Sequence, residues 1–110
     1  MGLTKTEIFT EKQNKLASMM KALGHPARIA ILQLLIKSQA CICGHLVEEL
    51  GLAQATISQH LKELKNVGLI KGNIEGNSIC YCIDEKTFLK FQSFLSAIFK
   101  KLGKKKDTCC

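Results

Sequence analysis

Two short helical patterns separated by a tight turn occupy residues 44–68, and this spacing constrains the fold more than any other feature of the chain. Residues 44–50 form the first pattern, which ends at Gly51. Residues 54–66 form the second, with apolar residues at spacings of four and three, and it ends near Gly68. Glycine is the usual residue just past the end of a helix. The sequence therefore predicts a helix-turn-helix unit.

The hydrophobic period changes to strict alternation directly after this unit. Residues 69–74 and 78–83 alternate apolar and polar side chains, and the second run places three large apolar residues on one face, Ile79, Tyr81 and Ile83. The glycine-containing segment 75–77 between the runs is typical of a hairpin turn. A hairpin in this place is a wing, so the pattern predicts a winged helix-turn-helix.

Three further helical patterns flank the unit, over residues 7–23, 26–37 and 85–102. Gly24 is suited to end the first, and Pro26 is suited to begin the second. The second is apolar on nearly all sides, which is typical of a buried central helix. The predicted fold is mainly α with a small β-hairpin wing, in the order ααααββα.

The last helical pattern has more apolar surface than a small domain needs for its own core. Large apolar residues recur along 85–102 at spacings of three and four, and Phe94 and Phe99 widen this face. We therefore expect this helix to pack on a second copy of the chain. Packing within one chain is the alternative.

Length and charge narrow the class of protein. The 110 residues suffice for one compact domain, and no apolar run approaches the ~20 residues of a membrane span. No signal-peptide pattern opens the sequence, so we expect a cytoplasmic protein without a membrane partner. The net charge of +7 divides into +3 (11 − 8) over residues 1–99 and +4 (5 − 1) over residues 100–110. A basic chain favours nucleic acid as partner, although the tail itself is expected to be solvated.

The outward face of the helix predicted over 54–66 has side chains suited to the major groove of DNA. Glutamine can bond adenine at two positions, hydroxyl groups reach bases or phosphates, and methyl groups touch thymine. The candidate DNA-binding residues are Gln54, Ala55, Thr56, Ser58, Gln59, His60, Lys62 and Lys65 of this helix, with Lys71 and Asn77 of the wing. For His60, a structural role inside the domain is the alternative.

The six cysteines occur as three close pairs, Cys41-x-Cys43, Cys80-x-Cys82 and Cys109-Cys110. Close pairs on a chain without a signal peptide favour binding of a soft ion, or redox chemistry, over structural disulfides. On a regular helix, residues two apart point away from each other. Cys41 and Cys43 can therefore hold one ion only if their segment is frayed or extended.

Three segments resemble the ArsR/SmtB family of winged-helix repressors. The run 23–32, LGHPARIAIL, is similar to the opening signature of that family, and the run 56–64, TISQHLKEL, resembles its recognition helix. Residues 68–70 with the following hairpin resemble its wing. The resemblance implies a homodimer that joins through its first and last helices, binds a pseudo-palindromic double-stranded operator and has no enzymatic activity. Residues 1–103 would form this single DNA-binding and dimerisation domain, followed by a flexible Lys/Cys tail at 104–110.

The resemblance also gives the first cysteine pair a role. The metal-binding box of arsenic and cadmium sensors occupies the position of Cys41 and Cys43, which implies that a thiophilic ion, above all As(III) or Sb(III), binds there and releases the DNA. We expect the third thiolate for such an ion from Cys109 or Cys110. Cd(II), Pb(II) and Zn(II) are alternative inducers, although residues 85–102 lack the histidines of zinc and nickel sensors.

The other cysteine pair and the remaining alternatives follow from residue chemistry. Cys80 and Cys82 share one face of a predicted strand, and we expect both to be buried as small apolar residues. A thiol site in the wing is the alternative. His45 is expected to be solvated. A dithiol redox sensor on the same fold is the alternative function, whereas the lack of Cys-x-x-Cys and of an acid–base group argues against a thiol enzyme. No obligatory cofactor is expected.

Overall fold

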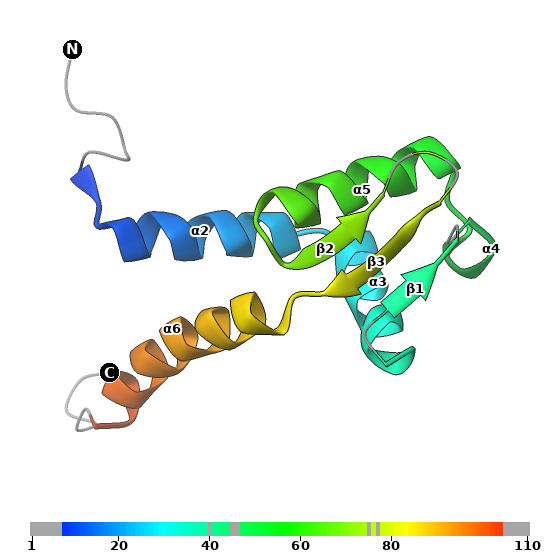
Figure 1. Cartoon of the computed structure of the whole chain (residues 1–110). Coiled ribbons are helices and arrows are strands. Elements are labelled where there is room, and N and C mark those ends of the chain that lie inside the picture. The colour runs from blue at the N-terminus through cyan, green and yellow to red at the C-terminus, as the bar shows by residue number, and fades with distance from the viewer. Residues whose placement is uncertain (1–7, 40, 45–46, 75, 77, 105–110) are drawn as a thin grey trace, which may run out of the picture.

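The computed structural model describes residues 8–39, 41–44, 47–74, 76 and 78–104, and it has the element order of a winged helix-turn-helix (Figure 1). The elements are α2 (Glu11–Leu23), α3 (Pro26–Lys37), β1 (Cys41–Cys43), α4 (Val47–Leu50), α5 (Gln54–Asn66), β2 (Ile70–Asn73), β3 (Cys80–Ile83) and α6 (Glu85–Lys104). Helices α2 and α6 contact each other and extend from one side of the body formed by the other elements. The predicted fold class is therefore confirmed. No helix in the described part of the chain is long and apolar enough to cross a membrane.

Helix α2 begins later than the sequence predicted, because its first turn is capped. The Thr10 hydroxyl accepts a hydrogen bond from the backbone N–H of Gln13 at 3.1 Å, and the Gln13 side chain accepts one from the Thr10 N–H at 2.9 Å. This reciprocal pair is a capping box and fixes the first helical residue at Glu11 rather than at residue 7.

Helix α5 has the bounds predicted from the sequence and ends as predicted at a glycine. Gly68 has φ +81°, a conformation that glycine adopts without steric cost. The Gly68 N–H donates to Lys65 O at 2.9 Å and the Leu69 N–H donates to Leu64 O at 3.1 Å. This pair of bonds satisfies carbonyls at the helix end and turns the chain into the wing.

Strand β1 is an element that the sequence analysis did not predict. The three strands form an antiparallel sheet in the order β1-β3-β2, so β1 extends the predicted hairpin by one strand. The helix expected over 44–50 is reduced to α4. Gly44 has φ +100°, and its N–H donates to Ile79 O at 2.8 Å, which holds this part of the chain on the sheet. The three residues of β1 are too few to give a recognisable period in the sequence.

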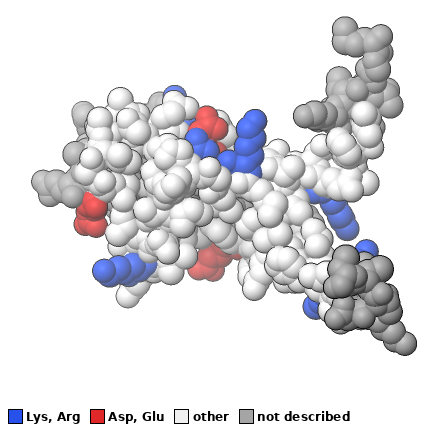
Figure 2. Space-filling model, turned by 180° about the vertical axis from the view of Figure 1, so that it is seen from behind, with Lys and Arg blue, Asp and Glu red and all other residues white. Residues whose placement is uncertain are grey.

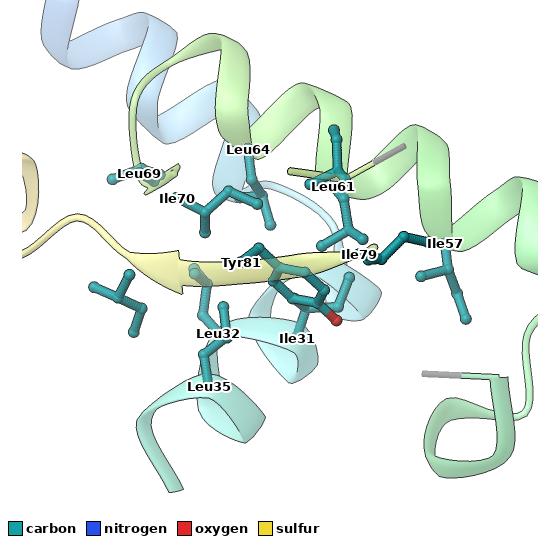
Figure 3. Packing of buried hydrophobic residues seen from close by; sticks show 12 residues of the cluster. Ile31, Leu32, Leu35, Ile57, Leu61, Leu64, Leu69, Ile70, Ile79 and Tyr81 are labelled. Carbon is teal, nitrogen blue, oxygen red and sulfur yellow. The ribbon is translucent and has the colours of Figure 1, made fainter. Parts of the chain in front are cut away.

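The core lies between α3, α5 and the inner face of the sheet (Figure 3). The Tyr81 ring lies at its centre, 0% exposed, and burial raises the pKa of its phenol to about 12. The other labelled core residues are Ile31, Leu32 and Leu35 of α3, Ile57, Leu61 and Leu64 of α5, and Leu69, Ile70 and Ile79 near the wing. The burial of Ile79, Tyr81 and Ile83 confirms the alternation predicted for the second strand.

Candidate functional site

Helix α5 divides into an apolar inner face and a polar outer face. Its residues Ile57, Leu61 and Leu64 are at most 2% exposed and fix how the helix is rotated about its axis. Of the predicted DNA-binding residues, Ala55, Thr56, Gln59, Lys62 and Lys65 are exposed, and Gln54 and Ser58 are half-buried. The structure thus places these seven side chains on or beside one outward surface at the N-terminal and middle turns of α5.

Two hydrogen bonds order the amide groups of this surface. The Gln54 amide nitrogen donates to the Ser58 hydroxyl at 3.2 Å, and the Gln59 amide nitrogen donates to a Glu63 carboxylate oxygen at 3.1 Å. Both pairs join residues four apart on one helix. Because each bond uses only part of an amide, Gln54 and Gln59 keep acceptor oxygens that can be directed at a donor on a base.

His60 does not belong to this surface, which corrects its place among the candidate DNA contacts. It is 7% exposed, and its Nδ1 atom accepts a hydrogen bond from Arg28 Nε at 3.1 Å. The His25 ring lies 4.4 Å away, centre to centre. Burial, followed by the charges of His25 and Arg28, lowers the pKa of His60. His60 therefore joins α5 to α3 as a neutral structural residue, which was the alternative interpretation of the sequence.

The wing supplies a second part of the surface. Lys71 is exposed on β2, and the Lys65 ammonium group donates to Gly72 O at 2.7 Å, so the end of α5 is bonded to the same strand. The predicted contact Asn77 lies outside the described residues. On the face seen in Figure 2, lysine and arginine side chains are scattered over a largely uncharged surface. Positive charge for DNA is thus carried by separate lysines.

The cysteines of β1 and β3 are brought together by the register of the sheet. Cys41 pairs with Cys82 and Cys43 pairs with Cys80, and the Cα atoms are 4.0 Å apart in each pair. Both pairs are disulfide-bonded. The 4.0 Å spacing is that of the closer kind of antiparallel pair, whose side chains approach each other most.

Comparison with known proteins agrees with this geometry. The family model described as "bacterial regulatory protein, arsR family" matches residues 25–71, which run from the start of α3 into β2. An uncharacterized HTH-type transcriptional regulator of Methanocaldococcus jannaschii is 40% identical over 78 residues, which are 69% of this chain and 86% of that protein. The chain belongs to the ArsR family. Family members are DNA-binding transcriptional regulators and not enzymes.

Two further relatives of this ArsR-family protein show how far the likeness extends. The HTH-type transcriptional repressor SmtB of Mycobacterium tuberculosis is 41% identical over 63 residues, 57% of this chain and 46% of that protein. An ArsR-like transcriptional regulator from Rhodococcus sp. RHA1 superposes with a TM-score of 0.69 at 24% identity, over 86% of this chain and 88% of the other. The likeness in structure therefore includes most of the chain, whereas the likeness to SmtB is confined to a shorter segment.

The ArsR-family chain departs from the expectation for its second cysteine pair. Cys80 is exposed and Cys82 is half-buried, so the prediction that both are buried as apolar residues is wrong. The alternation of β3 puts Tyr81 in the core, and its cysteine neighbours consequently face outward. The sequence contained a signal for this pairing, since Cys-Ile-Cys and Cys-Tyr-Cys have the same alternation and can lie side by side as strands.

The proposed thiol ligands differ in what the structure describes. Cys41 and Cys43 are exposed on extended chain, the condition that the sequence analysis set for both to face one ion. Cys109, Cys110 and His45 lie outside the described residues. With the four sulfurs bonded in pairs, the described residues contain no group of three or more side chains that could hold a metal ion.

Helix α6 of this ArsR-family chain leaves a large apolar groove open to the surface. Its volume is ≈ 820 Å³. Apolar residues from three elements line it, namely Ile36 of α3, Ile83 of β3, and Phe88, Phe91, Leu95 and Phe99 of α6. The end of α6 is also apolar outside the groove, since Ile98 is 52% and Leu102 is 68% exposed. The apolar surface predicted for this helix is thus present within one chain and uncovered.

Proposed function

We propose that this protein represses transcription by binding a double-stranded operator as a homodimer in the cytoplasm, and that a thiophilic ion, As(III) or Sb(III), releases it from the DNA by binding at Cys41 and Cys43. One observation carries the proposal. Both cysteines are exposed on the same face of β1, and the chain leads from this strand into α4, the first helix of the helix-turn-helix. Residues two apart on a strand point to the same side, so both thiolates can approach one ion.

The polar face of α5 is proposed to read the operator. Small and hydroxyl side chains, among them Ala55 and Thr56, let the N-terminal turns of a helix enter the major groove. Lys65 and Lys71 would contact phosphates beside the groove. Because phosphate contacts release counterions, binding should weaken steeply as salt concentration rises.

Homodimer formation is supported by the uncovered apolar surface of α6. Leu89 is 63% exposed and Phe99 is 62% exposed, and an apolar groove runs beside them. Helix α2 contacts α6 and adds Met20, which is 48% exposed. A second copy of the chain would remove this surface from water and would place two recognition helices on two half-sites. Sedimentation of the protein at micromolar concentration tests this point, and a monomer would contradict it.

Repression controlled by thiol oxidation is a second candidate function, and the disulfides Cys41–Cys82 and Cys43–Cys80 favour it. Each disulfide forms when two thiols give two electrons and two protons to one peroxide molecule, which becomes two water molecules. The cytoplasm normally keeps thiols reduced, so such disulfides would form there only under oxidative conditions. Operator affinity would then report peroxide rather than a metal ion.

The deciding experiment is fluorescence anisotropy of the reduced protein on DNA from upstream of its own gene, titrated with arsenite and then with Cd(II) and Zn(II). We expect near-stoichiometric release by arsenite. The Cys41→Ser/Cys43→Ser variant should bind the DNA but no longer respond. If that variant responds like the wild type, the site is elsewhere. If peroxide releases the reduced protein and no ion does, the second candidate function replaces the first.

The DNA surface is tested with single substitutions in the same assay. Lys71→Ala should weaken binding to all sequences alike and reduce the salt slope by about one, as expected for one lost phosphate contact. Gln59→Ala should instead weaken binding to the operator more than binding to random DNA. Lys90→Ala, an exposed lysine on α6, is the matched control and should change neither quantity. Equal effects of Lys71→Ala and Lys90→Ala would contradict the proposed surface.

A further inference from the structure

One face of the three-stranded sheet is dominated by cysteine. Register partners lie opposite each other, and residues two apart share a face. The pairs Cys41↔Cys82, Cys43↔Cys80, Lys71↔Cys82 and Asn73↔Cys80 therefore place six side chains on one side of the sheet, Cys41 and Cys43 from β1, Cys80 and Cys82 from β3, and Lys71 and Asn73 from β2. We refer to these six residues as the thiol face.

The four sulfur atoms of the thiol face are close enough to share one ion. Across the strands, the Cα atoms are 4.0 Å apart in both cysteine pairs. Along the strands, the two pairs are separated by about 7 Å, two residues of extended chain. A tetrahedral ion with metal–sulfur bonds of about 2.3 Å holds its sulfurs roughly 4 Å apart. Small side-chain rotations towards the centre of the four cysteines thus suffice, and the bonded pairs already show that the sulfurs meet across the strands.

We propose that Cys41, Cys43, Cys80 and Cys82 form a single site for one thiophilic ion in the reduced protein. This inference rests on the proposed function and completes its ligand set. The third thiolate then comes from β3 of the same chain, and Cys109 and Cys110 are not ligands. Three of these four cysteines are exposed and Cys82 is half-buried, so an ion can reach the site from solvent.

The chemistry of the site balances without further groups. A small dithiol reductant gives two electrons and two protons to each disulfide and becomes a disulfide itself, which leaves four thiols. Arsenite, As(OH)₃, then exchanges its three hydroxyl groups for three thiolates and releases three water molecules. A divalent ion such as Cd(II) binds all four sulfurs and releases four protons. The disulfide form has no thiolate to offer, so oxidation and ion binding exclude each other.

The position of the site gives it a direct connection to the DNA surface. Lys71, the proposed phosphate contact of the wing, lies opposite Cys82 on the thiol face. Its ammonium group stabilises thiolates nearby. The next residue, Gly72, accepts the hydrogen bond from Lys65 at the end of α5. An ion that draws β1 and β3 together therefore acts on strands that are bonded to the recognition helix and to the wing.

The first test uses the reduced wild-type chain and follows which cysteines an ion protects from iodoacetamide. With one equivalent of Cd(II), mass spectrometry should find Cys41, Cys43, Cys80 and Cys82 protected and both tail cysteines alkylated. The disulfide form of the protein should retain no Cd(II) after gel filtration. Alkylation of Cys80 and Cys82 at the rate seen without Cd(II) would overturn the inference, and so would protection of the tail cysteines in their place.

The second test separates this inference from the proposed function. Cys80→Ser/Cys82→Ser should bind Cd(II) at least tenfold more weakly, with roughly half of the thiolate-to-cadmium absorbance, and Cys109→Ser/Cys110→Ser is the matched control that should match the wild type. Circular dichroism checks that each variant is folded. If arsenite still releases Cys80→Ser/Cys82→Ser from the operator as it does the wild type, the four-cysteine site fails and the proposed function stands. If four thiolates bind the ion but no ion releases the wild type, the reverse holds.

Discussion

The two faces of strand β3 have opposite properties, although their residues alternate along four positions of the same chain. Tyr81 and Ile83 point into the core and are 0% and 8% exposed. Cys80 and Cys82 point outward and meet the cysteines of β1. The inner face packs against α3 and α5, whereas the outer face packs against no helix in the described part of the chain.

This difference shows how a small regulator separates stability from chemistry. Core residues are close-packed, so a change in their volume is felt throughout the domain. The outer residues of the same strand can change their bonding without disturbing that packing. Signal chemistry on the outer face can therefore vary while the inner face preserves the winged-helix fold.

The largest effect that tests this comparison is expected at Tyr81. Truncation to Ala should lower the free energy of unfolding by about 4 kcal/mol, as for other large buried aromatics. Tyr81→Phe is the matched control. The Tyr81 hydroxyl is buried without a hydrogen-bond partner, and removal of such a group is expected to be neutral or stabilising by about 1 kcal/mol. Urea unfolding measures both. A loss above about 1 kcal/mol in Tyr81→Phe would show that the hydroxyl has a partner.

Reduction of the disulfides is expected to come next. They join residues 41 and 37 positions apart in the sequence, and closing one such loop restricts the unfolded chain by roughly 4 kcal/mol. The second disulfide closes nearly the same loop and should add little. Urea unfolding with and without reductant should therefore differ by about 4 kcal/mol at most. A variant with all four cysteines changed to Ser should show no dependence on reductant, and any dependence there would point to another thiol.

A smaller effect is expected at Gly72, which lies opposite Tyr81 on β2. Gly72 has φ +117°, and a Cβ atom there would lie 2.9 Å from the Tyr81 Cα atom. Gly72→Ala should therefore cost about 2–3 kcal/mol of unfolding free energy, from backbone strain and from the clash. Gly76→Ala is the control, since Gly76 has φ +82° but open space around it, and should cost about 1 kcal/mol. Equal losses would mean that the strands separate to relieve the clash.

The smallest effect concerns pH and the buried contact between α3 and α5. Because the pKa of folded His60 lies below its ordinary value of 6.5, the unfolded chain binds a proton at a higher pH than the folded chain does. Stability should therefore decrease as pH falls below about 6.5, until folded His60 is itself protonated. Protonation of Nδ1 would also break the hydrogen bond from Arg28. His60→Gln should flatten this slope in urea unfolding between pH 7 and pH 5, and an unchanged slope would assign it to other groups.

The sequence was sufficient for those parts of the fold in which one strong period or one stop signal decides the local structure. Helices α3 and α5 have the predicted bounds because dense apolar spacing and Pro26 or Gly68 mark them. It was insufficient for β1, since three residues give no period and pairing with β3 is a long-range contact. For the same reason, the sequence predicted the inward side of β3 but assigned Cys80 and Cys82 to the interior as well.

The candidate site follows the same division. The exposed face of α5 could be predicted, because Ile57, Leu61 and Leu64 fix the buried side and leave the rest outside. The role of His60 could not, since its partner Arg28 is 32 positions away in the sequence. Residues that act through distant partners need the tertiary structure before their role can be assigned.

The register that places Lys71 opposite Cys82 has a consequence for the electrostatics of the wing. Disulfides and thiols carry no charge, and three thiolates around a trivalent ion also sum to zero. Four thiolates around a divalent ion leave two negative charges beside the lysine proposed to contact a phosphate. Ions that fit the same cysteines would then differ in how strongly they repel DNA, so the valence of the bound ion, as well as its affinity, would set the response of the operator.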